Sequence, residues 1–101
     1  MKIPLAKPVF DEEMKNAALD ALQNEKFVMG ESVFRFEEEF ARYCGARYAV
    51  STGSGTSALH LSLLALGVKR GDRVVTTPAS FVATANVALH VNAVPVFMFF
   101  N

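Results

Sequence analysis

The chain has 101 residues, of which 51% are hydrophobic, and its ten basic and ten acidic side chains leave no net charge. This length holds one domain, and the apolar content suffices for a packed core and argues against disorder. The balanced charge points to neither a nucleic-acid partner nor an anionic membrane, and no unbroken apolar run is long enough to span a bilayer. Cys44 is the single cysteine, which excludes an internal disulfide and fits a reducing compartment, so we expect a cytoplasmic protein.

The first half of the sequence predicts an extended arm followed by two helices. Residues 1–10 contain two prolines, which favour extended backbone. Asp11 is a suitable N-cap for a helix whose apolar residues recur at helical spacing, and residues 24–30 form a break after it. Ser32 is expected to cap a second helix, which Gly45 would end in a left-handed conformation. The apolar stripe of the second helix consists of Val33, Phe36, Phe40 and Tyr43.

From residue 47 onward, strand patterns alternate with helix patterns. We expect strands at Tyr48–Ser51, Arg73–Thr77 and Val94–Phe100, and helices at Thr56–Leu66 and Ser80–His90. This order is typical of βαβ units and therefore predicts an α/β fold with a mainly parallel sheet. Pro95 has no N–H group to donate to a sheet, so the last strand should be an edge strand or start late.

The two later helices differ in their expected packing. The helix at 56–66 is apolar nearly all round, so we expect it to be buried on most sides, as one layer of an α/β domain would be. In the helix at 80–90, the side chains expected to face the core are Val82, Ala85 and Leu89.

Two loops carry residues suited to binding a phosphorylated aromatic ligand. Gly55, Thr56 and Ser57 follow the first strand and open a helix, where free N–H groups and hydroxyls can hold an anion. Phe81 follows the next strand and offers a ring face. Because parallel α/β sheets bind ligands outside the carboxyl ends of their strands, both loops should lie at one rim of the sheet. Taken separately, the first loop also fits an ordinary capped helix start, and Phe81 fits a core aromatic residue.

Other well-known sites fit this sequence less well. Residues 53–58 match the G-x-G-x-x-A form of the dinucleotide fingerprint only weakly, because Asp72 is the one acid near the position that would bind a ribose. A P-loop is excluded, since no Gly-Lys-Ser/Thr is present. His60 and His90 have no partner at metal-ligand spacing along the chain, so no metal site is predicted.

Several blocks of the sequence resemble the N-terminal part of the DegT/DnrJ/EryC1/StrS aminotransferases, in the order and at the spacing of that family. The blocks are PLAKPVFDEEM, FVMGESVFRFEEEFARYCGARYAV and GSGTSALHLSLLALGVKRGDRVVTTPASFVATANVAL, which cover nearly all of the chain. The resemblance implies the N-terminal part of the large domain of a pyridoxal-phosphate (PLP)-dependent transferase of fold type I, with three α/β/α layers and a mainly parallel sheet.

By this resemblance, Gly55, Thr56 and Ser57 hold the phosphate of PLP, Phe81 stacks on its pyridine ring, and the segment ending at Gly30 lies near the sugar. The resemblance implies an enzyme that moves an amino group from a donor such as glutamate to a keto-sugar nucleotide. It also implies a homodimer with active sites at the subunit interface. No nucleic-acid or membrane partner and no metal are expected.

The resemblance further implies that the catalytic groups lie outside this sequence. The chemistry of the family needs a Schiff-base lysine and a carboxylate on the pyridine nitrogen, and family members carry both beyond position 101. Lys69 and Asp72 are expected at the opposite rim from Thr56 and Phe81, so no catalytic residue is predicted here. After Phe97 the sequence departs from the family pattern, as a cut or a change of reading frame would cause.

We therefore expect residues 1–101 to be a single incomplete domain, with an arm and two helices in 1–46 and the start of the cofactor-binding α/β domain in 47–101. In the family fold, the strand at Tyr48–Ser51 lies at the opposite edge of the sheet from the two later strands, so it would have no partner in this chain. We expect marginal solubility and no cooperative unfolding.

Two other functions remain open at this point. One is a non-catalytic module that binds a phosphorylated ligand or regulates a partner. The other is a Rossmann-like dinucleotide-binding domain, which tight binding of NAD would favour.

Overall fold

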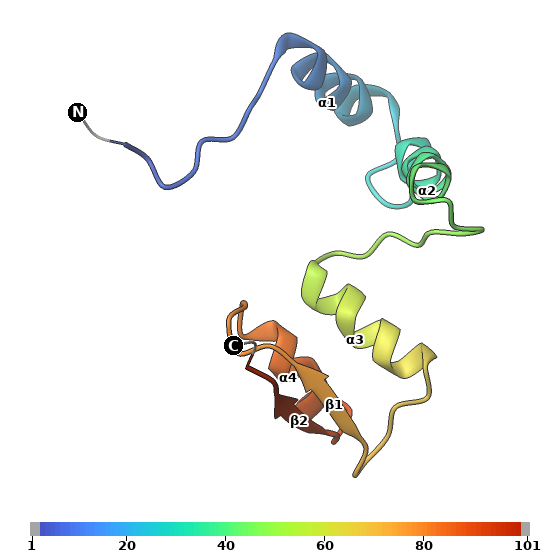
Figure 1. Cartoon of the computed structure of the whole chain (residues 1–101). Helices are drawn as coiled ribbons and strands as arrows, with labels where there is room; N and C mark the ends of the chain where they lie inside the picture. The colour runs from blue at the N-terminus through green and yellow to red at the C-terminus, as the bar shows by residue number, and fades with distance from the viewer. Residues whose placement is uncertain (1–2, 100–101) are drawn as a thin grey trace. The chain divides into compact units, whose positions relative to one another are not determined.

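In the computed structural model, which describes residues 3–99, helices and strands alternate only in the second half of the chain (Figure 1). The elements are α1 (Glu12–Asn24), α2 (Glu31–Cys44), α3 (Gly55–Ala65), β1 (Arg73–Thr76), α4 (Ala83–His90) and β2 (Val94–Phe97). The chain divides into two compact units, residues 1–50 and 51–101. Within residues 3–99, none of the helices combines the length and the apolar character needed to cross a bilayer.

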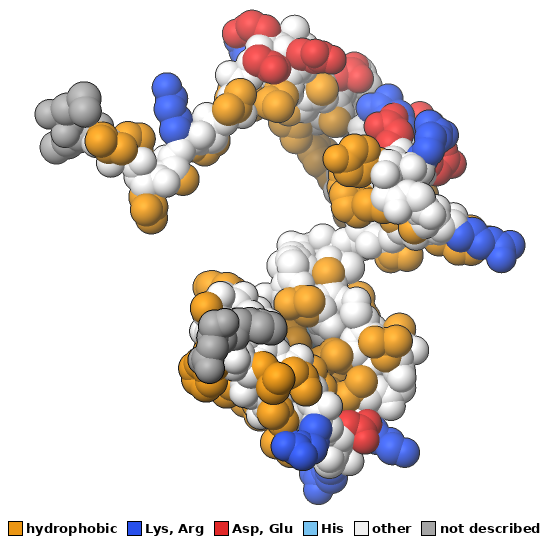
Figure 2. All heavy atoms as spheres, viewed as in Figure 1, with side chains coloured by type: hydrophobic (Ala, Val, Ile, Leu, Met, Phe, Trp, Pro, Cys, Tyr) orange, Lys and Arg blue, Asp and Glu red, His pale blue; other side chains and the backbone are white. Residues whose placement is uncertain are grey.

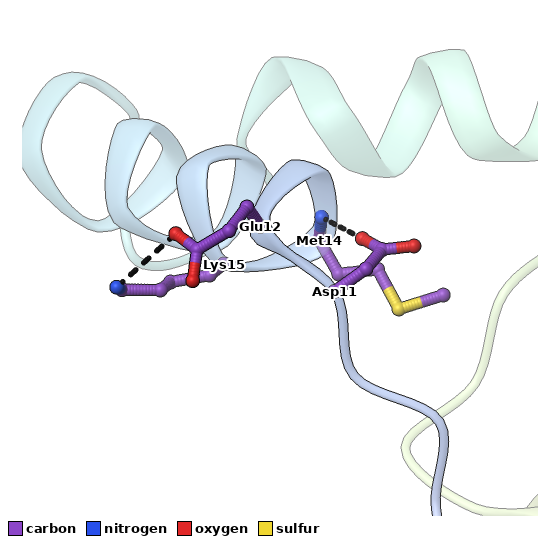
Figure 3. Close-up of polar contacts among 4 residues, drawn as sticks. All are labelled: Asp11, Glu12, Met14 and Lys15. Atoms are coloured by element: carbon purple, nitrogen blue, oxygen red, sulfur yellow. Dashed lines mark hydrogen bonds and ion pairs between the residues drawn. The ribbon is translucent and has the colours of Figure 1, made fainter.

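In the unit of residues 1–50, α1 begins at the aspartate predicted to cap it. The Asp11 carboxylate accepts a hydrogen bond of 2.8 Å from the backbone N–H of Met14 (Figure 3). This bond satisfies one of the N–H groups that the first turn of a helix leaves without an intrahelical partner. Glu12 and Glu13 lie in the same turn, where carboxylates interact favourably with the helix dipole. Lys15 and Glu12 form an exposed ion pair at 3.3 Å.

The start of α2 differs from the sequence-based expectation. The predicted cap Ser32 lies inside the helix, which begins at Glu31 with Gly30 as its N-cap residue. The carboxylate of Glu25 instead accepts hydrogen bonds from the backbone N–H of Ser32, at 2.9 Å, and from its hydroxyl. These bonds from Ser32, with a smaller contribution from Arg35, lower the pKa of Glu25. A charged carboxylate is a stronger acceptor than a hydroxyl, so the acid takes the capping role and the serine becomes a donor.

The loop between α1 and α2 has a tightly constrained backbone. Met29 has a φ angle of 55°, in the left-handed region that residues other than glycine rarely adopt. At Gly30, an added Cβ would lie 2.6 Å from Oε2 of Glu25 and 2.9 Å from the carbonyl oxygen of Lys26. The hydrophobic side chains of residues 27–29 are exposed. The fold therefore fixes the path of this loop and still presents apolar groups to solvent.

α2 ends where the sequence predicts. Gly45 has a φ angle of 65°, and its N–H donates to the carbonyl of Arg42 at 3.2 Å. This left-handed residue closes the last turn of the helix. Within the predicted apolar stripe, the rings of Phe36 and Phe40 have centroids 5.6 Å apart, yet both side chains are exposed, and Ala41 is the residue of α2 that is buried.

The unit of residues 51–101 contains the second of the two predicted βαβ crossovers. β1 and β2 pair in parallel, with Arg73 opposite Val94 and Thr76 opposite Phe97, and α4 connects them. β1 is one residue shorter than predicted, and α4 begins at Ala83 rather than at residue 80. β2 ends at Phe97, and the last predicted strand residue, 100, lies outside the described residues.

The strand predicted at Tyr48–Ser51 is not present among the described residues of this chain. In the sheet that the structure describes, β1 and β2 pair only with each other. A strand forms when its N–H and C=O groups meet those of a neighbouring strand, and neither β1 nor β2 pairs with residues 48–51. The prediction of strand from composition was therefore wrong for this chain, and the described sheet consists of β1 and β2 without residues 48–51.

Pro95 lies inside β2 and does not delay the start of the strand. The N–H groups of Val94 and Met98 donate to the carbonyls of Asp72 and Thr76 at 2.8 and 2.9 Å. Because alternate residues of a strand bond to the same neighbour, the nitrogen of Pro95 faces away from β1. β2 is thus an edge strand, as predicted, and its proline is on the free edge.

The core of this second unit is small and consists of small side chains around α4. Its buried residues are Ala83, Val87, Ala88, Val91 and Ala93. Leu63, Val68 and Val74 are partly buried and pack against Ala88, Val91 and Ala93. Val82 and Leu89 were predicted to face the core but are 59% and 56% exposed, and Ala85 is half-buried. α4 is apolar on more than one face, so its periodicity does not select the face that contacts β1 and β2.

α3 is not buried on most sides, contrary to the sequence-based expectation. None of its residues is buried, and among the described elements of its unit it packs mainly against α4. An apolar helix is covered only where other elements lie against it, and in this chain that is one side. Hydrophobic side chains are accordingly spread over the visible surface (Figure 2).

Candidate functional site

The Gly/Ser/Thr loop opens α3, and its hydroxyl groups are arranged around the helix N-terminus. Ser54 is the N-cap residue: its hydroxyl oxygen accepts a 3.1 Å hydrogen bond from the N–H of Ser57 and lies 3.0 Å from the Ser57 hydroxyl. The hydroxyl of Thr52 donates to the carbonyl of Ser54 at 2.9 Å. The N–H groups of Gly55 and Thr56 belong to the first turn, which offers them no intrahelical acceptor. The positive end of α3 therefore presents backbone and hydroxyl donors together.

The chain itself gives no steric reason for glycine at position 55. Its φ angle is not in the left-handed region, and a Cβ added to Gly55 would meet no heavy atom within 4 Å. The first turn of α3 also contains no acidic side chain that would repel an anion. A glycine that the fold does not require leaves the backbone open to close approach by a ligand, which suits a phosphate at a helix N-terminus.

Phe81 lies in the segment that leads from β1 into α4. Its side chain is 76% exposed, so it is not a core aromatic residue in this chain. The ring borders a hollow of about 270 Å³ near the carboxyl ends of β1 and β2, which is also lined by Thr77, Pro78, Ser80, Val82, Ala85 and Phe97. The carbonyl of Phe81 accepts a 3.0 Å hydrogen bond from the N–H of Thr84, which fixes the turn into the helix.

The two candidate loops lie at the same end of the second unit. β1 and β2 point their carboxyl ends toward this end, and α3 and α4 begin there (Figure 1). Gly55, Thr56 and Ser57 are adjacent in one helical turn. In the described part of the chain, the hollow beside Phe81 is lined by residues 77–85 and Phe97 and by none of residues 53–57. The Phe81 ring and the Gly/Ser/Thr loop therefore lie at the same end of the unit but do not line the same cavity.

The lysine and the acid of this unit are at its other end. In residues 51–101, Lys69 is the only lysine and Asp72 the only acidic residue. Asp72 accepts a 2.9 Å hydrogen bond through Oδ2 from the backbone N–H of Lys69, and both lie in the turn that enters β1. The carboxylate therefore stabilises this turn, and neither residue is placed to act on a ligand at the N-terminus of α3.

A second hollow, of about 690 Å³, lies in the first unit beside the turn that joins α1 to α2. Gly30 and Met29 border it, next to charged side chains of both signs: Asp20, Glu25, Lys26, Glu31, Arg35 and Glu38. The mixed charge favours polar ligands over purely anionic ones. Gly30 ends the segment that the sequence resemblance associates with the sugar.

One pair of residues was missed by sequence reasoning. The imidazole rings of His60 on α3 and His90 on α4 have centroids 5.4 Å apart, with an angle of 67° between the ring planes. The two positions lie on different helices, so no local spacing pattern connects them. Predicting this pair would have required knowing that α3 packs on α4 and how each helix is rotated about its own axis.

Comparison with known proteins gives the family and the extent of the match. Residues 8–99 match the profile of the DegT/DnrJ/EryC1/StrS aminotransferase family. The UDP-4-amino-4-deoxy-L-arabinose–oxoglutarate aminotransferase of Shewanella sediminis is 38% identical over 96 residues, which are 95% of this chain and 25% of that protein.

Solved structures agree with the family match. The X-ray structure of the aminotransferase from Psychrobacter cryohalolentis has 34% sequence identity and a TM-score of 0.81, over 93% of this chain and 25% of that one. The GDP-4-keto-6-deoxy-D-mannose-3-dehydratase of E. coli, solved with bound hydrated PLP, has 28% identity and a TM-score of 0.89, over 99% of this chain and 27% of that one.

These matches confirm the predicted fold class, an α/β fold of the PLP-dependent transferase type with a parallel sheet. The chain spans about a quarter of the length of the relatives that it matches. Since the family profile covers residues 8–99, the chain belongs to the DegT/DnrJ/EryC1/StrS aminotransferase family.

Proposed function

We propose that this chain supplies the phosphate-binding and ring-stacking part of a PLP-dependent sugar aminotransferase, as its N-terminal portion. The observation that carries the proposal is the first turn of α3, where Gly55, Thr56 and Ser57 combine N–H and hydroxyl donors with a glycine that the fold does not need. Family membership and the PLP bound in the related E. coli enzyme support it. In this proposal the cofactor-binding domain starts within residues 47–101.

When bound, PLP supplies an electron sink at its pyridine ring, and the residues of this chain bind and orient it. The N–H groups of Gly55 and Thr56 and the hydroxyls of Thr56 and Ser57 hold the phosphate, whose charge the α3 dipole also favours. Ser54 keeps Ser57 in position through their hydroxyl contact of 3.0 Å. Phe81, whose ring is exposed, covers one face of the pyridine and excludes water from it.

No catalytic residue is proposed within the chain. The reaction needs an amine that bonds the cofactor and moves a proton, and an acid at the pyridine nitrogen. Lys69 and Asp72 are held in the turn before β1, away from the N-terminus of α3. The role of this chain in the proposed active site is therefore limited to binding and orienting the cofactor and excluding water from it.

The proposed substrates are a keto-sugar nucleotide and an amino donor such as glutamate. The name of the Shewanella relative includes both a UDP-sugar and oxoglutarate, and the E. coli relative acts as a dehydratase on a GDP-sugar. A sugar nucleotide is common to the two, and the aminotransferases among the relatives favour amination over dehydration. We further propose a cytoplasmic homodimer, with no nucleic-acid or membrane partner and no metal at the cofactor site.

The proposal is tested by titrating the 101-residue chain with PLP and following the cofactor absorbance, with inorganic phosphate as competitor. Ser57→Ala and Phe81→Ala should each weaken binding by about fivefold, as the loss of one hydrogen bond or one ring contact of about 1 kcal/mol predicts. Ser62→Ala is the matched control, because its hydroxyl is used within α3, donating to the carbonyl of Ala58 at 2.8 Å. Equal affinities for Ser57→Ala and Ser62→Ala would contradict the proposed phosphate site.

A second measurement tests the absence of a catalytic lysine. Reduction of the mixture of PLP and chain with borohydride should leave no adduct specific to one lysine. A stoichiometric adduct at a single lysine, located by peptide mass spectrometry, would overturn that part of the proposal. Tight binding of NAD with no effect of PLP would instead favour the dinucleotide-binding alternative.

A further inference from the structure

His60 and His90 form a pair of imidazoles across the α3–α4 contact. Their ring centroids are 5.4 Å apart, and the helices that carry them pack against each other. His60 is half-buried and His90 is exposed, so the pair lies where a contact between two helices meets solvent. The pair is separate from the proposed cofactor site at the first turn of α3, because His60 follows that turn and His90 is the last residue of α4.

The surroundings of the pair leave its nitrogen atoms available. Among the described residues, the imidazole side chains of His60 and His90 make no hydrogen bond or ion pair in addition to the ring contact. Apart from these two imidazoles, α3 (GTSALHLSLLA) and α4 (ATANVALH) contain no titratable side chain. No cation on either helix would therefore repel a metal ion, and no carboxylate competes for it.

We propose that His60 and His90 together form a binding site for Zn²⁺ that links α3 to α4. With Zn–N bonds of about 2.1 Å and a tetrahedral angle at the metal, the centroids of two ligating imidazoles lie about 5.3 Å apart. The observed separation is 5.4 Å. In this proposal each ring turns one nitrogen toward the ion, a rotation that the broad χ2 torsion of histidine favours.

The chemistry of the pair selects the class of metal. Imidazole nitrogen is a ligand for Zn²⁺ and other late first-row ions, whereas Ca²⁺ and Mg²⁺ require oxygen ligands. Within residues 3–99, no group of three or more His, Cys, Asp or Glu side chains is placed to bind one metal ion. The site therefore has two protein ligands, and water completes the tetrahedron. Such a site binds more weakly than a closed structural zinc site with four protein ligands.

The test is a Zn²⁺ titration of the full chain, in competition with a chromophoric chelator, for the wild type and for His60→Gln and His90→Gln. We expect one bound ion per chain and a loss of affinity of at least about tenfold in either variant, since even the loss of an outer-shell partner costs that much at metal sites. Cys44→Ser is the control, because this exposed thiol in the first unit is of a ligand type that Zn²⁺ also binds. Its affinity for Zn²⁺ should equal that of the wild type.

NMR of the imidazole groups distinguishes a shared ion from two independent ones. In a shared site, the resonances of His60 and His90 respond together and are complete at one equivalent of Zn²⁺. The proposal is overturned if the two histidine resonances respond at different zinc concentrations, if two ions bind, or if His60→Gln leaves the titration unchanged. These outcomes decide the question whether or not the isolated chain is fully folded. A loss of binding in Cys44→Ser alone overturns it too. Retained PLP affinity in both histidine variants separates this site from the cofactor site.

Discussion

The Glu25 carboxylate, at the end of α1, holds the N-terminus of α2 by accepting hydrogen bonds from both the N–H and the hydroxyl of Ser32. One side chain thus connects the two helices of the first unit. Gly30 leaves room for it, since a Cβ there would contact the same carboxylate. The position of α2 relative to α1 therefore depends on the charge of Glu25 and on the absence of a side chain at Gly30.

The charge of Glu25 gives a pH prediction. Its pKa in the folded chain lies below the ordinary value of 4.5, because Ser32 donates two hydrogen bonds to the charged form. The stabilisation is therefore present above the unfolded pKa and is lost as the pH falls through the lower folded value. Near neutrality, the contribution of the Glu25 charge to the protection of the Ser32 amide against hydrogen exchange should not depend on pH. This protection should decrease when the pH is lowered below 4.5.

Glu25→Gln should weaken the protection of the Ser32 amide already at neutral pH, because a neutral amide oxygen is a weaker acceptor than a carboxylate. Glu38→Gln makes the same charge change within α2 and is the control. Equal exchange rates at Ser32 in the two variants would show that Glu25 does not hold the helix in solution.

Gly30→Ala should disrupt the first unit. The new Cβ would be 2.6 Å from Oε2 of Glu25 and 2.9 Å from the backbone carbonyl of Lys26, and the carbonyl moves only with the backbone. Overpacking of this kind costs about 1–3 kcal/mol. Gly53→Ala is the matched control, since no heavy atom lies within 4 Å of its added Cβ. Far-UV circular dichroism against urea should show a loss of helix for Gly30→Ala alone.

Asp11→Ala should shorten α1 from its N-terminus. The substitution removes the acceptor of the 2.8 Å bond from Met14, and loss of a cap costs about 1 kcal/mol. Lys15→Ala breaks the exposed ion pair with Glu12 and should cost only about 0.3 kcal/mol. Amide exchange at Met14 distinguishes the two, and similar rates in both variants would mean that the cap contributes little.

The isolated chain should unfold over a broad temperature range and should bind a hydrophobic dye. Among residues 3–99, no large side chain is fully buried, and the core of the second unit consists of alanines and valines. Many large hydrophobic side chains lie on the surface (Figure 2). Exposed apolar area of this extent favours association. A sharp two-state transition from a soluble monomer, measured by calorimetry and light scattering, would contradict this expectation.

Local features were predictable from the sequence because their causes are local. Asp11 caps α1 and Gly45 ends α2, since each depends on a few neighbouring residues. The parallel pairing of β1 and β2 also follows from the order strand, helix, strand, because a short connection through one helix brings two strands together side by side. The free N–H donors at the start of α3 are also a local feature, since every helix N-terminus carries them.

Features that depend on distant partners were not predictable from the sequence. Ser32 is a good cap by composition, but Glu25 reaches it from the preceding helix and takes over that role. Residues 48–51 have the composition of a strand but no neighbouring strand. Val82 and Leu89 are apolar and exposed, because α4 turns another face to the sheet.

The sequence by itself determined the caps of α1 and α3, the end of α2 and the order of the elements from α3 to β2, because each depends on neighbouring residues. The tertiary structure alone decided which apolar faces are covered and that His60 meets His90. Burial and contact between helices depend on how two elements are rotated against each other. When a helix is apolar on several faces, as α3 and α4 are, its periodicity does not specify that rotation.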